Sequence, residues 1–146
     1  MPTADFEERC RRSFGLQQFM ATLGARLVSV HPGEVIIELP FSSHLAQQHG
    51  FLHAGAIASI LDSACGYAAL SLMSEGSAVL SVEYKINLMK PAAGSIFRAT
   101  GKVLRSGKTL SVCTGTAEAN QDGTWSAIAV MQATMIALKE QSALED

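Results

Sequence analysis

The stretch that decides the fold runs from His53 to Met73 and reads HAGAIASILDSACGYAALSLM. Its length and its small, apolar or hydroxyl-bearing side chains predict a long helix with little polar face. Such a helix has to be covered on several sides, so we expect a sheet on one side and another element opposite. Asp62 is its one formally charged residue, and burying a carboxylate is costly unless the group is paired or used.

The composition of the whole chain limits which classes of protein it can belong to. The chain has 146 residues, which suits a single domain over residues 1–146. Charged residues make up only 16% of the chain and hydrophobic residues 48%, which indicates buried contacts between subunits. With a net charge of −2, no nucleic-acid partner is expected. The three cysteines lack metal-type spacing and predict reduced thiols in a cytoplasmic protein.

A membrane location is not expected either. Residues 54–73 are long enough to cross a bilayer, but Asp62 near their middle and the many small residues argue against a membrane span. The N-terminus carries acidic residues and arginines where a signal peptide would need an apolar run.

The segments around the helix predict mainly strands. Residues 4–23 are the exception and predict two helical pieces broken near Gly15, with the charged cluster on a solvated face. Gly76 is the expected C-cap of the central helix. Apolar and polar side chains alternate over residues 78–89, which is typical of a half-buried strand. The core, at about residues 25–138, should be a meander of about six strands, at residues 25–30, 34–39, 78–89, 95–105, 109–119 and 125–138.

The start of the central helix is a second candidate functional element. The free N–H groups of His53–Gly55 and the helix dipole favour negative charge, such as the oxyanion of an acyl-transfer intermediate. From Ala54 to Asp62 is about 12 Å along the helix axis, whereas a base and an oxyanion donor must both lie within about 3–4 Å of one carbonyl. Two antiparallel copies in a twofold dimer would satisfy both requirements. At this point a purely structural role for Asp62 is an equal alternative.

The residues around both elements resemble the signature of hotdog-fold acyl-CoA thioesterases, and most closely the phenylacetate-pathway (PaaI-type) group. The matching positions are Gln47-x-x-Gly50-x-Leu52-His53-Ala54-Gly55-Ala56-x-Ala58-x-x-Leu61-Asp62-x-x-x-Gly66-x-Ala68. Residues 80–91 and 103–108 add supporting similarity. The resemblance implies an α+β hotdog fold, in which a curved antiparallel sheet of about six strands wraps a long central α-helix. It also implies a homodimer with composite active sites, and a tetramer formed from two dimers.

The resemblance further implies a role for each matching residue. Asp62 matches the catalytic carboxylate, as general base or nucleophile. Gln47 matches the residue that orients the water or the thioester, with Gln48 as the alternative if the loop shifts by one position. His53 matches the histidine that contacts the thioester region.

The remaining matches concern the oxyanion and the coenzyme. The amide of Ala54 or Gly55 matches the oxyanion donor, although Ala54 stands where the family usually has glycine. Ser81 matches a polar residue that positions water in some members. Gly50, within the matching stretch, is expected to take part in substrate binding. The turn that touches the nucleotide end of coenzyme A in such families corresponds to Arg105, Ser106, Gly107 and Lys108, for which a plain hairpin turn is an equal alternative.

The implied function is hydrolysis of an acyl- or aryl-CoA thioester to the free acid and coenzyme A. No metal is implied, and no cofactor beyond the coenzyme A of the substrate. One alternative is a hotdog hydratase or dehydratase, which the lack of proline between Pro40 and Pro91 disfavours. The other is a non-catalytic acyl-CoA-binding hotdog protein, against which the set Gln47, His53 and Asp62 argues.

Overall fold

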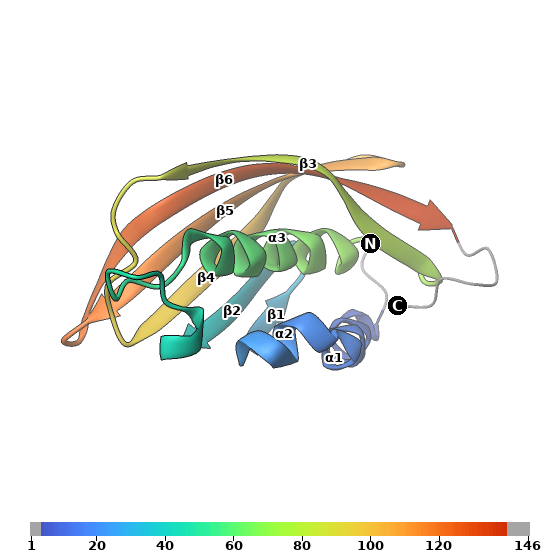
Figure 1. Ribbon diagram of the computed structural model, residues 1–146. Coiled ribbons are helices and arrows are strands. Elements are labelled where there is room, and N and C mark those ends of the chain that lie inside the picture. The colour runs from blue at the N-terminus through green and yellow to red at the C-terminus, as the bar shows by residue number, and fades with distance from the viewer. Residues whose placement is uncertain (1–3, 140–146) are drawn as a thin grey trace.

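The computed structural model describes residues 4–139 and confirms the hotdog arrangement. The long helix α3 (Ala54–Leu70) lies on the concave side of a curved antiparallel sheet, as Figure 1 shows. Two shorter helices, α1 (Phe6–Leu16) and α2 (Gln18–Leu23), lie on the other side of α3. A single 3₁₀ turn, Ser43–Leu45, begins the loop that leads into α3. The central helix is therefore covered on two sides, as its lack of a polar face requires.

The sheet has six strands, but they do not form a simple meander. Their order is β1-β2-β4-β5-β6-β3, so β3 follows α3 in sequence but lies at the far edge, beside β6. The chain therefore crosses through α3 from β2, next to one edge of the sheet, to β3 at the opposite edge, and the predicted meander is wrong on this point. The strand bounds are β1 Arg26–His31, β2 Glu34–Pro40, β3 Ser77–Leu88, β4 Ile96–Ser106, β5 Leu110–Gln121 and β6 Thr124–Lys139.

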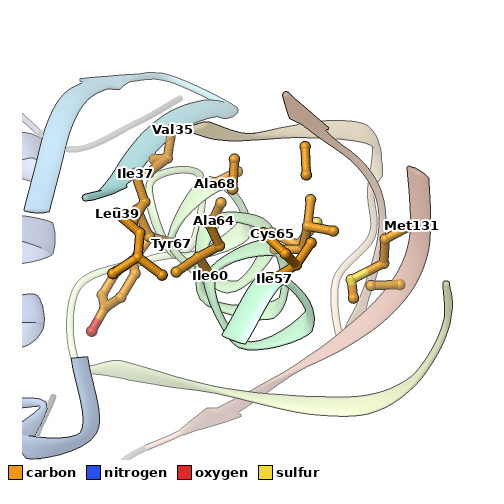
Figure 2. Close-up of a cluster of buried hydrophobic side chains, with 14 of the residues drawn as sticks. Val35, Ile37, Leu39, Ile57, Ile60, Ala64, Cys65, Tyr67, Ala68 and Met131 are labelled. Carbon is orange, nitrogen blue, oxygen red and sulfur yellow. The ribbon is translucent and has the colours of Figure 1, made fainter. Parts of the chain in front are cut away.

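The central helix approaches the sheet closely because two glycines leave room for it. Gly101 on β4 and Gly115 on β5 are cross-strand partners. A Cβ atom at Gly101 would lie 2.4 Å from the backbone C and O atoms of Ala64, and one at Gly115 would lie 3.0 Å from the Leu61 side chain. Around this contact Figure 2 shows the apolar cluster of α3 and β2, including Val35, Ile37, Leu39, Ile57, Ile60, Ala64, Cys65 and Ala68.

The edge strand β3 is more exposed than its alternating sequence predicts. Leu80, Val82 and Tyr84 are 51%, 55% and 45% exposed. A β-bulge at Val82 also breaks the alternation, since Ser81 pairs with Met135 and Glu83 pairs with the adjacent Thr134, which leaves Val82 without a partner in β6. Cross-strand partners share a face of a sheet. Met135, the partner of Ser81, and Ala133, the partner of Tyr84, are both buried. The bulge therefore turns both Ser81 and Tyr84 towards the concave side.

The N-terminal helices differ from expectation in two respects. The break between them falls at Gln17, which has an extended backbone, and Gly15 lies inside α1. Arg9 is buried rather than solvated, with 7% of its surface exposed. Its guanidinium donates hydrogen bonds to the carbonyl oxygens of Leu70, Met73 (2.9 Å) and Ser74 (2.8 Å), all at the C-terminal end of α3. A cation at this end also complements the helix dipole.

The end of α3 is capped by Ser71 and not by the predicted glycine, Gly76. The C-cap is Ser71, whose hydroxyl donates to the Ala68 carbonyl and accepts from the Gly33 N–H at 2.8 Å. Gly76, with φ of 73°, belongs to the turn that leads into β3. Within residues 4–139, no helix combines the length and apolar character needed to cross a bilayer.

The substitution Gly101→Ala should destabilise the fold by at least about 2 kcal/mol, because backbone atoms of α3 cannot yield to the added methyl group. Gly15→Ala is the matched control, since a Cβ there meets nothing within 4 Å. Inside a helix this control should gain up to about 1 kcal/mol. Urea unfolding of both variants measures the difference, and equal stability of Gly101→Ala and the wild type would contradict this contact.

Candidate active site

Asp62 and Ser81 meet in one small cavity beside the edge of the sheet. Asp62 lies half-buried in the middle of α3, and the Ser81 hydroxyl donates a hydrogen bond to its Oδ1 at 2.6 Å. The bulge at Val82 makes this contact possible, because it leaves Ser81 on the concave face beside Met135. The cavity has a volume of about 210 Å³. Within residues 4–139 Asp62 forms no ion pair, so its second oxygen stays available to a ligand.

Gln47 and Ala54 line a second and larger cavity, of about 460 Å³. Apolar side chains such as Phe51, Met89 and Ile128 form much of its wall. Neither Asp62 nor Ser81 contributes to this cavity, and neither Gln47 nor Ala54 contributes to the smaller one. One chain thus brings Asp62 and Ser81 together, and Gln47 and Ala54 together, but keeps the two pairs apart.

His53 is the N-cap of α3 and engages one of the two candidate oxyanion donors. Its Nδ1 accepts a hydrogen bond from the Gly55 N–H at 2.7 Å. A Cβ atom at position 55 would lie 2.9 Å from this nitrogen, so glycine is needed for the cap. Because the Gly55 amide is occupied, the Ala54 amide is the N–H left for a ligand at the helix start. The methyl group of Ala54 does not prevent this, since the residue is exposed.

The loop before the helix favours Gln47 over Gln48. A tight turn closes where the Gly50 N–H donates to the Gln47 carbonyl, with Gly50 at φ of +87°. The Gln47 side chain accepts a hydrogen bond from the His49 amide and lines the larger cavity. Gln48 is exposed and does not contribute to that cavity. No shift of the loop by one position is needed.

The turn with Arg105, Ser106, Gly107 and Lys108 lies at the same level of the sheet as Ser81. Ser81 pairs with Met135, Met135 with Ser111, and Ser111 with Ser106, so these residues form one row across four strands. Three strand spacings correspond to about 14 Å along the row. Arg105 and Lys108 are exposed and, in the part of the chain described, form no ion pair.

Ser13 of α1 and Gln17, which directly follows α1, also reach the smaller cavity, and their role was missed in the sequence. Ser13 and Gln17 line it, and both form hydrogen bonds with the Tyr67 hydroxyl. The signal was present, because Arg9, Ser13 and Gln17 follow one another at intervals of four residues and so share a helix face. This polar stripe lies beside the apolar residues Phe6, Cys10 and Phe14, which are also spaced by four along α1.

Thiol and metal chemistry find no support in the described residues. Burial raises the pKa of Cys65 to about 12, with further increases from Cys113 and Asp62. Burial likewise raises the pKa of Cys10 and that of Cys113 to about 11. Buried thiols with such pKa values are poor nucleophiles. Within residues 4–139, no three His, Cys, Asp or Glu side chains gather closely enough to hold a metal ion.

Comparison with known proteins identifies the family. Residues 49–126, more than half of the chain, match the family model described as the thioesterase superfamily. This chain belongs to the thioesterase superfamily. A thioesterase family protein from Silicibacter pomeroyi is 51% identical, with a TM-score of 0.90, and the alignment covers 91% of this chain and 98% of that one.

Two further proteins, a curated relative and a solved structure, are similar to this thioesterase at lower sequence identity. Human acyl-coenzyme A thioesterase 13 is 36% identical over 86 residues, which cover 58% of this chain and 61% of the human protein. The PaaI protein of the Escherichia coli phenylacetic acid degradation operon has a TM-score of 0.80 at 20% identity, covering 90% of this chain and 91% of that one, and so shares the fold. Membership of the superfamily makes this thioesterase a thioester hydrolase. The matched region includes Ala54, Asp62 and Ser81, whereas Ser13 and Gln17 lie outside it.

Proposed function

We propose that this thioesterase hydrolyses acyl-CoA thioesters at a site built by two chains. The observation that carries the proposal is that Asp62 and Ala54 line different cavities of one chain. In an antiparallel pair of α3 helices, Asp62 of one chain faces Ala54 of the other. The concave face of β3 supports such a pair, because Tyr84 and Leu88 leave 45% and 56% of their surfaces uncovered.

In the proposed reaction, Asp62 acts through the oxygen that Ser81 does not hold. As a general base, it removes a proton from water while the water oxygen bonds to the thioester carbonyl carbon. As a nucleophile, it bonds to that carbon itself, expels the thiolate, and leaves an anhydride that water then hydrolyses. By either route, the carbonyl oxygen becomes negative and accepts a hydrogen bond from the Ala54 N–H of the partner chain. Collapse of the tetrahedral intermediate breaks the C–S bond and releases coenzyme A.

The turn at residues 105–108 is the proposed contact for the nucleotide end of coenzyme A. Arg105 and Lys108 offer two exposed cationic groups for phosphates, and Gly107 allows the backbone to approach. Their row across the sheet ends at Ser81, about 14 Å away by strand spacing, a span suited to the pantetheine arm.

Replacing Asp62 with asparagine should lower kcat about 10²- to 10⁴-fold on short, medium, long and aromatic acyl-CoAs, because the amide neither accepts the proton nor attacks carbon. Glu75→Gln is the control, since it removes an exposed carboxylate from the turn after α3. Thiol release in steady-state assays measures both. An unchanged kcat in Asp62→Asn would remove Asp62 from the mechanism.

Replacing Ala54 with proline should remove the proposed oxyanion donor and leave the helix intact. Ala54 is the first residue of α3, where proline is well tolerated, and His53 before it has the extended backbone that proline requires. We expect kcat to fall about 10²- to 10³-fold with little change in melting temperature. Ala54→Gly, which keeps the amide, should retain activity. If Ala54→Pro were as active as the wild type, this amide would have no role.

A further inference from the structure

The cavity around Asp62 has a polar wall that the hydrolytic reaction does not use. Ser13 and Tyr67 are 7% and 3% exposed, and the Ser13 hydroxyl lies 3.2 Å from the Tyr67 hydroxyl. Gln17 donates to the same hydroxyl through Nε2 at 2.9 Å. Figure 2 shows the Tyr67 hydroxyl pointing away from the apolar cluster. Replacing hydrogen-bonded polar groups such as these with apolar groups of the same shape is nearly neutral or stabilising, so stability alone does not explain this wall.

This wall is held rigidly relative to α3. The guanidinium of Arg9 binds three carbonyl oxygens at the end of α3, so α1 is fixed to the helix that carries Asp62. The ring of Phe14 packs edge-on against Tyr67, with 5.8 Å between ring centroids. Gln17 is therefore positioned by two separate contacts of α1 and not by its own hydrogen bond alone.

The cavity that Asp62 lines extends to this polar wall. Gly66 lies one helical turn after Asp62, lines the same cavity, and would place a Cβ atom with no neighbour within 4 Å. The Oε1 atom of half-buried Gln17 accepts no hydrogen bond from any described residue. An acyl group whose thioester carbonyl lies at Asp62 can therefore extend past Gly66 and end beside an acceptor.

We infer that Gln17 is a specificity residue that selects acyl groups carrying a hydrogen-bond donor, such as a hydroxyl, at their far end. The inference rests on the proposed function, because it takes Asp62 as the position of the thioester. A site that binds a hydroxyl rejects the analogue without it, since the buried acceptor then stays unsatisfied. The expected discrimination is about tenfold or more in kcat/KM.

The test uses matched acyl-CoAs of three lengths, built on butyryl, hexanoyl and octanoyl chains. Each length is supplied with a terminal methyl, a terminal hydroxyl or a terminal methoxy group, which can accept but not donate. For at least one length, the wild type should prefer the hydroxyl form about tenfold over both others. In Gln17→Met, which keeps the side-chain length, this preference should disappear through a higher KM for the hydroxyl form. Tyr67→Phe removes the hydroxyl that holds the Gln17 amide, so this variant should also show a weaker preference for the hydroxyl form.

Gln18→Met is the matched control, because Gln18 is the exposed neighbour of Gln17 and does not line the cavity. This variant should keep the wild-type preference. Hydrolysis of all three forms at equal rates by the wild type, or an unaltered preference in Gln17→Met, would overturn the role of Gln17 while leaving the proposed function standing. Absence of thiol release from every thioester would overturn both.

Discussion

The contact between the α3 backbone and the glycine pair Gly101 and Gly115 is the constraint on which the rest of the structure depends. A helix that touches a sheet at backbone distance cannot rotate about its axis without a clash. With Ala64 against Gly101, Asp62 is turned about 200° round the helix, away from the centre of the sheet. It therefore lies between the edge strand β3 and α1, where Ser81 and the polar wall reach it. Two residues without side chains thus determine where the Asp62 carboxylate lies.

The length of α3 then explains why one chain is insufficient for the proposed chemistry. The free amide at the helix start and the carboxylate in its middle lie in separate cavities, and no local rearrangement of a rigid helix brings them together. A second antiparallel copy of the helix brings them together without any bending. The same arrangement covers apolar side chains of β3 and accounts for a charged fraction of only 16%.

Sequence reasoning predicted the elements whose signals are local. The apolar helix and the strands follow from periodicity and composition, and the structure confirms both. The pairing of Asp62 with a helix start at one site stays a prediction. The strand order could not be derived from these local signals, since pairing of β3 with β6 depends on the crossover through α3. The contact of Ser81 with Asp62 depends on a bulge at Val82, where strict alternation would put Ser81 and Tyr84 on opposite faces. Arg9 was assigned to solvent because its partners are carbonyl oxygens more than sixty residues away, which leave no trace in its own neighbourhood.

The central claim, that each site combines Asp62 of one chain with Ala54 of another, is tested most directly by mixing two inactive subunits. Asp62→Asn and Ala54→Pro chains carrying different affinity tags are co-expressed, and oligomers containing both are purified and assayed for thiol release. In a mixed dimer one site holds both substitutions and the other holds neither, so activity should return to about half of the wild-type value. If the mixed oligomers were as inactive as the two parent proteins, each chain would carry a complete site and the composite arrangement would be wrong.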